Sequence, residues 1–190
     1  GGADGTPQIY RIHREVKRVI GDNSNLLRSF PPLTGRIFGL GYRGDGKRIA
    51  AGSSLDGRGY VAIYSSDFDG TLPKGMKGIL EKVSTSRSAA EHKKIKEFHA
   101  KNIEQIATVD FDIPIYSLCW HPQKNEIAVG GADGLVRFLD GENGALLRVL
   151  MSAPMSGEKG DDLVAMVVDP PAVEITEKFG YQQLIVTGIL

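Results

Sequence analysis

One five-residue sequence, Gly-Gly-Ala-Asp-Gly, occurs twice in this chain, at residues 1–5 and again at 130–134. A related stretch, Gly-Ser-Ser-Leu-Asp-Gly, lies between them at 52–57. The neighbouring residues also recur, in three further pairs of segments: 21–30 with 141–150, 36–42 with 114–120, and 48–52 with 126–130. Self-similarity in so many registers is typical of a protein built from structural repeats, which restricts the fold before any other argument is made.

Each repeat unit predicts four short antiparallel strands. In the unit with the clearest pattern, large apolar and small residues alternate over 114–120, and the apolar run 127–129 predicts a second strand. An Asp-Gly turn at 133–134 leads into a third strand at 135–139, and a Gly/Asn turn leads into a fourth at 146–150. Asp-Gly between apolar runs is a strong hairpin signal, because both residues tolerate a positive φ. Four such strands per unit make a propeller blade.

From Tyr116 to Leu150 the chain resembles a WD40 repeat. Leu139-Asp140 occupies the place of that family's Trp-Asp pair, which Tyr64-Ser65 and Tyr10-Arg11 occupy in the other units. The family's usual Gly-His dipeptide before the first strand is absent from both complete units, so these repeats are divergent. The resemblance implies a β-propeller whose rigid face binds proteins or neighbouring domains.

Two aspartates have alternative interpretations. Asp56 and Asp133 either fill the conserved aspartate position of the WD40 hydrogen-bond network or serve only as turn formers. The sequence leaves both open.

The fold class predicted is all-β, with 24 glycines and few aromatic residues favouring tight turns over long helices. We expect about three blades, one of them incomplete, within 1–152. A linker at 153–162 and the start of a bacterial Ig-like domain at 163–190 should follow. The Ig-like resemblance is carried by Pro170-Pro171-Ala172-Val173-Glu174-Ile175 and the strand pattern after it.

An insertion at about 67–105 interrupts the second unit. Its second half, from about Ser88 to Ile106, is rich in Ala, Glu and Lys and lacks Pro and Gly, which predicts a helix. Ile95, Phe98, Ile103 and Ile106 should share one side of it. The insertion is either a helix packed against a blade or a partner-docking surface, since insertions in repeats often map to a binding face. A second long link, 11–20, is basic.

Charge and composition argue against several functions. The 23 basic and 23 acidic residues balance, so the electrostatic footprint of a nucleic-acid binder is missing. The helix carries more basic than acidic residues (Arg87, Lys93, Lys94, Lys96 and Lys101 against Glu91 and Glu97), but without interleaved aromatics these predict a solvated surface. No apolar run is long enough to span a membrane.

Candidate metal and cofactor residues are few. His92 and His99 lie two helical turns apart, but no third ligand is evident. Cys119 is the only cysteine, so an intrachain disulfide, a haem-attachment motif and paired-cysteine zinc sites are all excluded. Beside Trp120, Cys119 is predicted to be a small buried hydrophobic residue.

The function predicted is a non-catalytic protein-interaction or scaffolding module, with no catalytic, cofactor or metal site in this segment. The alternatives are an enzyme domain on a propeller scaffold or an architectural spacer. The combined pattern resembles large bacterial extracytoplasmic proteins that join such repeats to a c-type cytochrome module. That resemblance implies a periplasmic or extracellular location.

Overall fold

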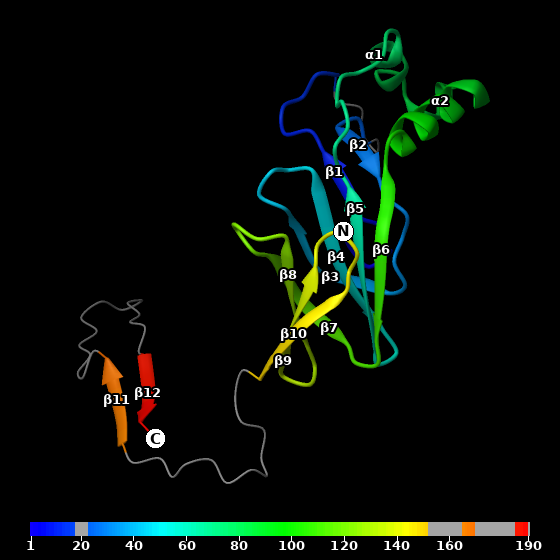
Figure 1. Cartoon of the computed structure of the whole chain (residues 1–190). Helices are drawn as coiled ribbons and strands as arrows, with labels where there is room; N and C mark the ends of the chain where they lie inside the picture. Colours follow the sequence, from blue (N-terminus) through cyan, green and yellow to red (C-terminus); the bar gives the residue numbers. More distant parts are fainter. Residues whose placement is uncertain (18–22, 152–164, 170–184, 190) are drawn as a thin grey trace, which may run out of the picture. The chain divides into compact units, whose positions relative to one another are not determined.

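The computed structural model describes residues 1–17, 23–151, 165–169 and 185–189. The chain divides into two compact units, Gly1–Ser152 and Ala153–Leu190. Within the described residues of the first unit, β-strands form three antiparallel sheets and a few short helices stand beside them (Figure 1).

Two of these sheets are four-stranded meanders in which each strand pairs with the next one along the chain. The first contains β3 (Arg36–Tyr42), β4 (Arg48–Leu55), β5 (Arg58–Ser65) and β6 (Glu104–Phe111). The second contains β7 (Ile115–Trp120), β8 (Glu126–Gly131), β9 (Leu135–Asp140) and β10 (Leu146–Met151). A two-stranded sheet pairs β1 (Gln8–Tyr10) with β2 (Leu26–Ser29). The prediction of an all-β chain with antiparallel sheets is confirmed.

The sequence repeats coincide with repeats of strand register. Tyr64 pairs with Ile49, and its counterpart Leu139 pairs with Ile127. The first strand of each sheet shifts register at the same relative place, across Phe38 in β3 and across Tyr116 in β7. The rings of these two aromatics meet edge to face, with centroids 5.4 Å apart. The repeats therefore share their irregularities as well as their strands.

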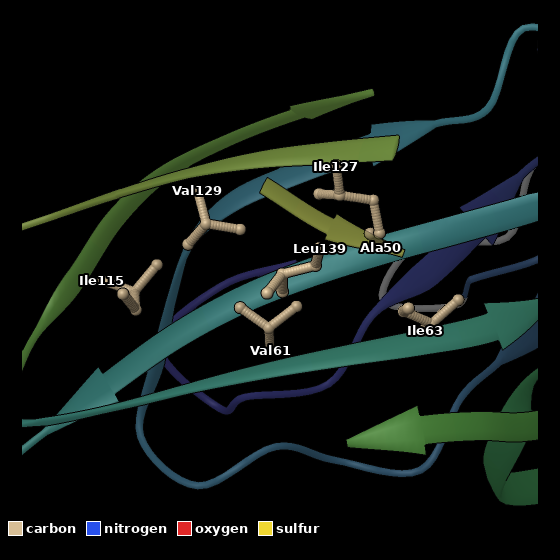
Figure 2. Close-up of a cluster of buried hydrophobic side chains, with 7 residues drawn as sticks. All are labelled: Ala50, Val61, Ile63, Ile115, Ile127, Val129 and Leu139. Carbon is tan, nitrogen blue, oxygen red and sulfur yellow. The ribbon is translucent and has the colours of Figure 1, made fainter. Parts of the chain in front are cut away.

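A buried apolar core lies between the two four-stranded sheets (Figure 2). The first sheet contributes Ala50, Val61 and Ile63, and the second contributes Ile115, Ile127, Val129 and Leu139. All are fully excluded from solvent. Burying a large aliphatic side chain stabilises a fold by about 1.5–3 kcal/mol, so this core is the main source of sheet-on-sheet stability.

The opposite face of the first sheet packs against the N-terminal part of the chain. Here Tyr64 stands where the WD40 resemblance places a tryptophan, and its ring lies 5.1 Å from that of Phe30. The Tyr64 hydroxyl donates a 2.8 Å hydrogen bond to the carbonyl oxygen of Pro31. Tyr64 thus satisfies its one buried polar group locally.

Cys119 is exposed, so the prediction of a buried cysteine was wrong. Leu118 and Trp120 turn toward the core between the sheets, and the alternation along β7 directs Cys119 to the opposite face. Strand β10, at the end of the same sheet, has all six of its residues exposed.

The predicted helix of the insertion is present but shorter. Helix α2 spans Ala89–Ala100, and Asn102 follows it with a positive φ of 54°. Residues from Glu104 onward belong to β6, where they pair with β5, so Ile103 and Ile106 do not lie on the helix. Two elements were not predicted: α1 (Met76–Leu80) and a 3₁₀ turn, η1 (Ser84–Ser86).

In the second unit, β11 (Ala165–Asp169) pairs antiparallel with β12 (Ile185–Ile189). The linker predicted at 153–162 and the segment 170–175 lie outside the described residues. The Ig-like assignment stays a prediction. None of the helices in the described ranges combines the length and the apolar character that a membrane crossing requires.

Candidate functional site

The residues between β5 and β6 form a small helical lobe rather than a single helix. We define the insertion lobe as residues 67–103, with α1, η1 and α2, together with the link residues 11–17 (Figure 1). Helix α2 begins at a capping box: Ser88 Oγ accepts from the Glu91 backbone N–H, and the Glu91 carboxylate accepts from the Ser88 N–H at 2.8 Å. Lys82 also donates to Glu91, and these contacts, that of Lys82 foremost, lower the pKa of Glu91 to about 2. The start of α2 is thereby fixed.

The lobe has its own apolar core, formed by four buried side chains. Met76 and Leu80 come from α1, Phe98 from α2, and Val16 from the link between β1 and β2. Arg11, in the same link, donates to the carbonyl oxygen of Gly70. The basic link between β1 and β2 is therefore part of the insertion lobe. The contacts of Val16 and Arg11 with the lobe join residues far apart in sequence, so no local sequence pattern could predict them.

Arg28 fastens the lobe to β2. Its side chain is almost fully buried, with 2% exposed. The guanidinium donates to the carbonyl oxygens of Asp69 at 3.0 Å and of Lys101 at 2.8 Å, one at each end of the lobe. It also lies between two aromatic rings, 4.2 Å from the centroid of Phe68 and 4.8 Å from that of Phe98. Planar arginine suits such a stacked, multiply hydrogen-bonded position.

Arg87 holds α1 in place from within the lobe. The sequence interpretation counted Arg87 among the surface charges of the helix, and this was wrong: the side chain is buried. It precedes α2 and donates to the carbonyl oxygens of Ile79, Leu80 and Lys82, at 3.0, 3.0 and 2.9 Å. Ile79 and Leu80 belong to the last turn of α1 and Lys82 follows it, so Arg87 ties the C-terminal end of α1 to the start of α2.

A cavity of about 630 Å³, open to solvent, lies between α1 and α2. Met76, Ile79 and Phe98 give it an apolar lining. Its other lining residues are mostly exposed and polar or small: Pro73, Lys74, Gly75, Lys94, Glu97, Ala100 and Lys101. The cavity is therefore an apolar hollow with charged side chains at its edge.

The candidate aspartates have the contacts of turn residues. Asp56 and Gly57 both have positive φ, 49° and 81°, in the two-residue turn between β4 and β5. The Asp133 carboxylate accepts from the Leu135 N–H at 3.2 Å and forms a two-point ion pair with Arg137. The Arg137 contact is the first cause of the lowered pKa of Asp133. The turn-former interpretation therefore describes both residues.

The two histidines of α2 lie on one side of it, as predicted. His92 and His99 line the same cavity of about 360 Å³ between α2 and β2. His92 Nε2 lies 3.1 Å from the carbonyl oxygen of Ser84. Across the part of the chain that the structure describes, no group of three His, Cys, Asp or Glu side chains is placed to hold a metal ion.

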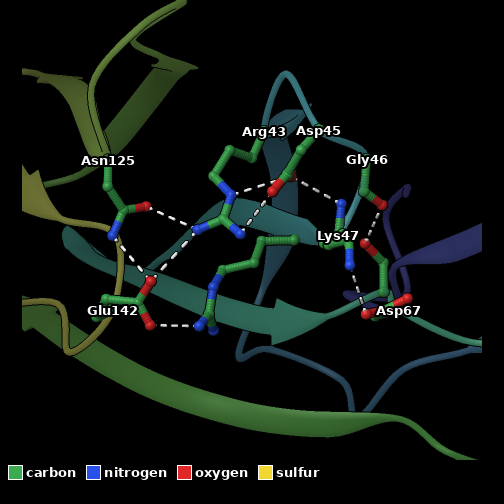
Figure 3. Close-up of polar contacts among 9 residues, drawn as sticks. Arg43, Asp45, Gly46, Lys47, Asp67, Asn125 and Glu142 are labelled. Atoms are coloured by element: carbon green, nitrogen blue, oxygen red, sulfur yellow. Dashed lines mark hydrogen bonds and ion pairs between the residues drawn. The ribbon is translucent and has the colours of Figure 1, made fainter.

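A polar network joins the turns of the two four-stranded sheets (Figure 3). Arg43 donates to Asp45 at 2.8 and 3.0 Å within the β3–β4 turn, and also to Asn125 at 3.0 Å and Glu142 at 3.3 Å in the second sheet. The Arg43 contact, followed by the Lys47 N–H, lowers the pKa of Asp45 to about 2. Because Arg43 of the β3–β4 turn binds Asn125 and Glu142 in turns of the second sheet, the network links the two sheets.

One comparison, with family models, agrees with the repeat pattern. The family model described as the Anaphase-promoting complex subunit 4 WD40 domain matches residues 88–168. A search of curated proteins found no match to the sequence.

Among solved structures, the chain is similar to Sqt1 of Chaetomium thermophilum. The crystal structure of Sqt1 bound to the N-terminus of the ribosomal protein L10 shows 17% identity and a TM-score of 0.47, over 78% of this chain and 31% of that chain. Another crystal structure of the same protein shows 17% identity and a TM-score of 0.48, over 78% and 30%. The chain thus spans about a third of the length of these structures. Residues 88–168 are thus similar to a WD40 domain, and the four-stranded antiparallel sheets are consistent with that similarity.

Proposed function

We propose that this chain is a non-catalytic protein-interaction or scaffolding module of the WD40-repeat type, and that the insertion lobe is its docking surface. The sheets would supply the support for the lobe, and the family-model match over 88–168, a range that includes α2, supports the proposal. Partners would be proteins or neighbouring domains of the same chain.

One observation carries the proposal: buried arginines hold the lobe in position, while the cavity between α1 and α2 stays open to solvent. Arg28 donates hydrogen bonds to backbone carbonyls at the two ends of the lobe, and Arg87 donates to carbonyls at the end of α1. These contacts hold both helices in place. On the outer side, α2 exposes Lys93 and Lys94, and the apolar cavity next to it is open to solvent. A preorganised surface loses little conformational entropy on binding, which favours affinity.

The experiment is affinity purification of the full-length protein and of a variant in which residues 74–100 are replaced by a short Gly/Ser linker. This replacement leaves β5 and β6 intact, whereas a longer deletion to 105 would remove the first residues of β6. A partner identified by mass spectrometry, crosslinked to lysines of the lobe and lost from the variant supports the proposal. A partner that the variant retains, or substrate turnover by the intact protein, contradicts it.

We also propose a wider context, based on the sequence resemblance alone. The chain would contain about three blades, one incomplete, followed by the start of a bacterial Ig-like domain. It would belong to a large extracytoplasmic bacterial protein with a c-type cytochrome module. The neighbouring coding sequence tests this: a signal peptide and a Cys-x-x-Cys-His motif would support the context, and their absence would contradict it.

A further inference from the structure

The cavity between α1 and α2 differs from a cofactor or metabolite site in where its polar groups lie. Small-molecule sites usually place a few fixed polar groups inside an apolar pocket. Here the interior is lined by Met76, Ile79 and Phe98, of which Ile79 is only half-buried. The charged groups lie on exposed side chains at the edge. This arrangement fits an apolar side chain that is presented by a polar chain.

The charge at the edge of the cavity is predominantly positive. Three lysines line it, Lys74 from the loop before α1, and Lys94 and Lys101 from α2 and its end. Glu97 is the only acidic residue lining it. Its Oε1 lies 3.9 Å from the Nζ of Lys93, a lysine that does not line the cavity. An acidic chain would therefore find an attractive potential at the edge, and a basic chain a repulsive one.

The cavity is also shaped before any ligand arrives. Arg87 binds carbonyls at the C-terminal end of α1 and just after it, and the Phe98 ring contacts the guanidinium of Arg28, 4.8 Å from its centroid. Anchoring of an apolar side chain in a preformed pocket is one recurring way in which folded domains bind partner segments.

We propose that this cavity receives a large apolar side chain from an acidic peptide segment of a partner protein. This inference rests on the proposed function, because it specifies the chemistry of the partner at the same lobe. The apolar side chain contacts Met76, Ile79 and Phe98, while flanking carboxylates of the segment face Lys74, Lys94 and Lys101.

The test uses a fluorescein-labelled peptide in which glutamates flank a single phenylalanine, titrated into the full-length protein and followed by anisotropy. The two control peptides carry alanine in place of phenylalanine, or lysines in place of the glutamates. We expect binding of the first peptide alone. Reversing the edge charges in K74E/K94E/K101E should weaken it by about tenfold or more, the scale expected when charge contacts become repulsive.

The matched control is K17E/K77E/K96E, which makes the same charge change at three exposed lysines of the same lobe that do not line this cavity. It should leave the affinity within about twofold, because exposed charges outside the contact are screened by salt. The single variant E97Q should tighten binding, and it keeps the test independent of any folding defect in the triple variants.

Several results would overturn the inference. These are equal loss of affinity in both triple variants, no effect of E97Q, binding of the alanine peptide as strong as that of the phenylalanine peptide, or binding to anionic phosphatidylserine vesicles in place of the peptide. If the partner is lost on replacement of 74–100 but the edge variants bind the peptide normally, the docking function stands and only the acidic-peptide inference fails.

Discussion

The side chain of Arg28 on β2 donates a 2.8 Å hydrogen bond from Nε to the carbonyl oxygen of Lys101, the residue that ends α2. Seventy-three residues separate the two in sequence. Arg28 also donates a hydrogen bond to the carbonyl oxygen of Asp69, near the start of the insertion. One buried arginine of β2 therefore binds the insertion both where it leaves the first sheet and where it returns to it.

Arg28→Ala should therefore destabilise the first unit by about 2–4 kcal/mol, since it removes a buried side chain together with its hydrogen bonds to the Asp69 and Lys101 carbonyls and its contacts with two aromatic rings. Arg28→Lys should recover part of this loss, because a lysine keeps the charge but not the planar fork. Urea unfolding of each variant measures the free energy of unfolding. Arg14→Ala, at an exposed position of the same lobe, is the control and should lie within about 0.5 kcal/mol of the unsubstituted chain.

Tyr64→Phe should cost about 1–2 kcal/mol, because the substitution removes only the hydroxyl that binds the Pro31 carbonyl. The single tryptophan, Trp120, packs against the core between the sheets and serves as the fluorescent reporter of unfolding. Tyr60 lies on the same strand, and its hydroxyl has no hydrogen bond to any described residue. Tyr60→Phe should thus be nearly neutral, and equal effects at the two positions would argue against the Tyr64 contact.

The network of Figure 3 predicts an acid dependence of stability. Hydrogen bonds from Arg43 and from the Lys47 N–H lower the pKa of Asp45 from 3.8 to about 2. Its carboxylate therefore stabilises the fold above pH 3.8, and that contribution is lost as the pH falls from 3.8 toward 2, because the unfolded state takes up the proton first. In thermal unfolding across this range, the unsubstituted chain should lose more stability than Asp45→Asn. Parallel curves would contradict the assignment.

The Cys119 thiol should react with a maleimide in the folded 190-residue chain without denaturant, because the side chain is exposed. Mass spectrometry of the modified protein counts the single adduct. A thiol that reacts only after urea is added would show that this face of β7 is covered in solution.

The sequence was most informative where structure repeats locally. The paired Gly/Asp turns located β3, β4 and β5 of the first sheet and all four strands of the second, because turn residues with positive φ such as Gly57 and Gly134 leave few alternatives. The start of β6 was mistaken for the end of the helix. Even the register shifts recur at matching aromatics, Phe38 and Tyr116.

The sequence was least informative where contacts span long distances along the chain. Nothing local shows that Val16 packs on α1 and α2, or that Arg28 and Arg87 are buried against carbonyls. Helix α1 is too short to produce an apolar period and contains Gly78, a poor helix former. Cys119 was misplaced because apolar neighbours at 118 and 120 do not show to which side of a strand an intervening residue turns.

The end strand of the second sheet has a practical consequence. Among the described strands, β10 pairs only with β9, and five of its apolar side chains are exposed: Leu146, Leu147, Val149, Leu150 and Met151. Its second row of backbone N–H and C=O groups is a ready template for a strand from another molecule. Concentrated preparations of this chain should therefore self-associate through intermolecular β-pairing.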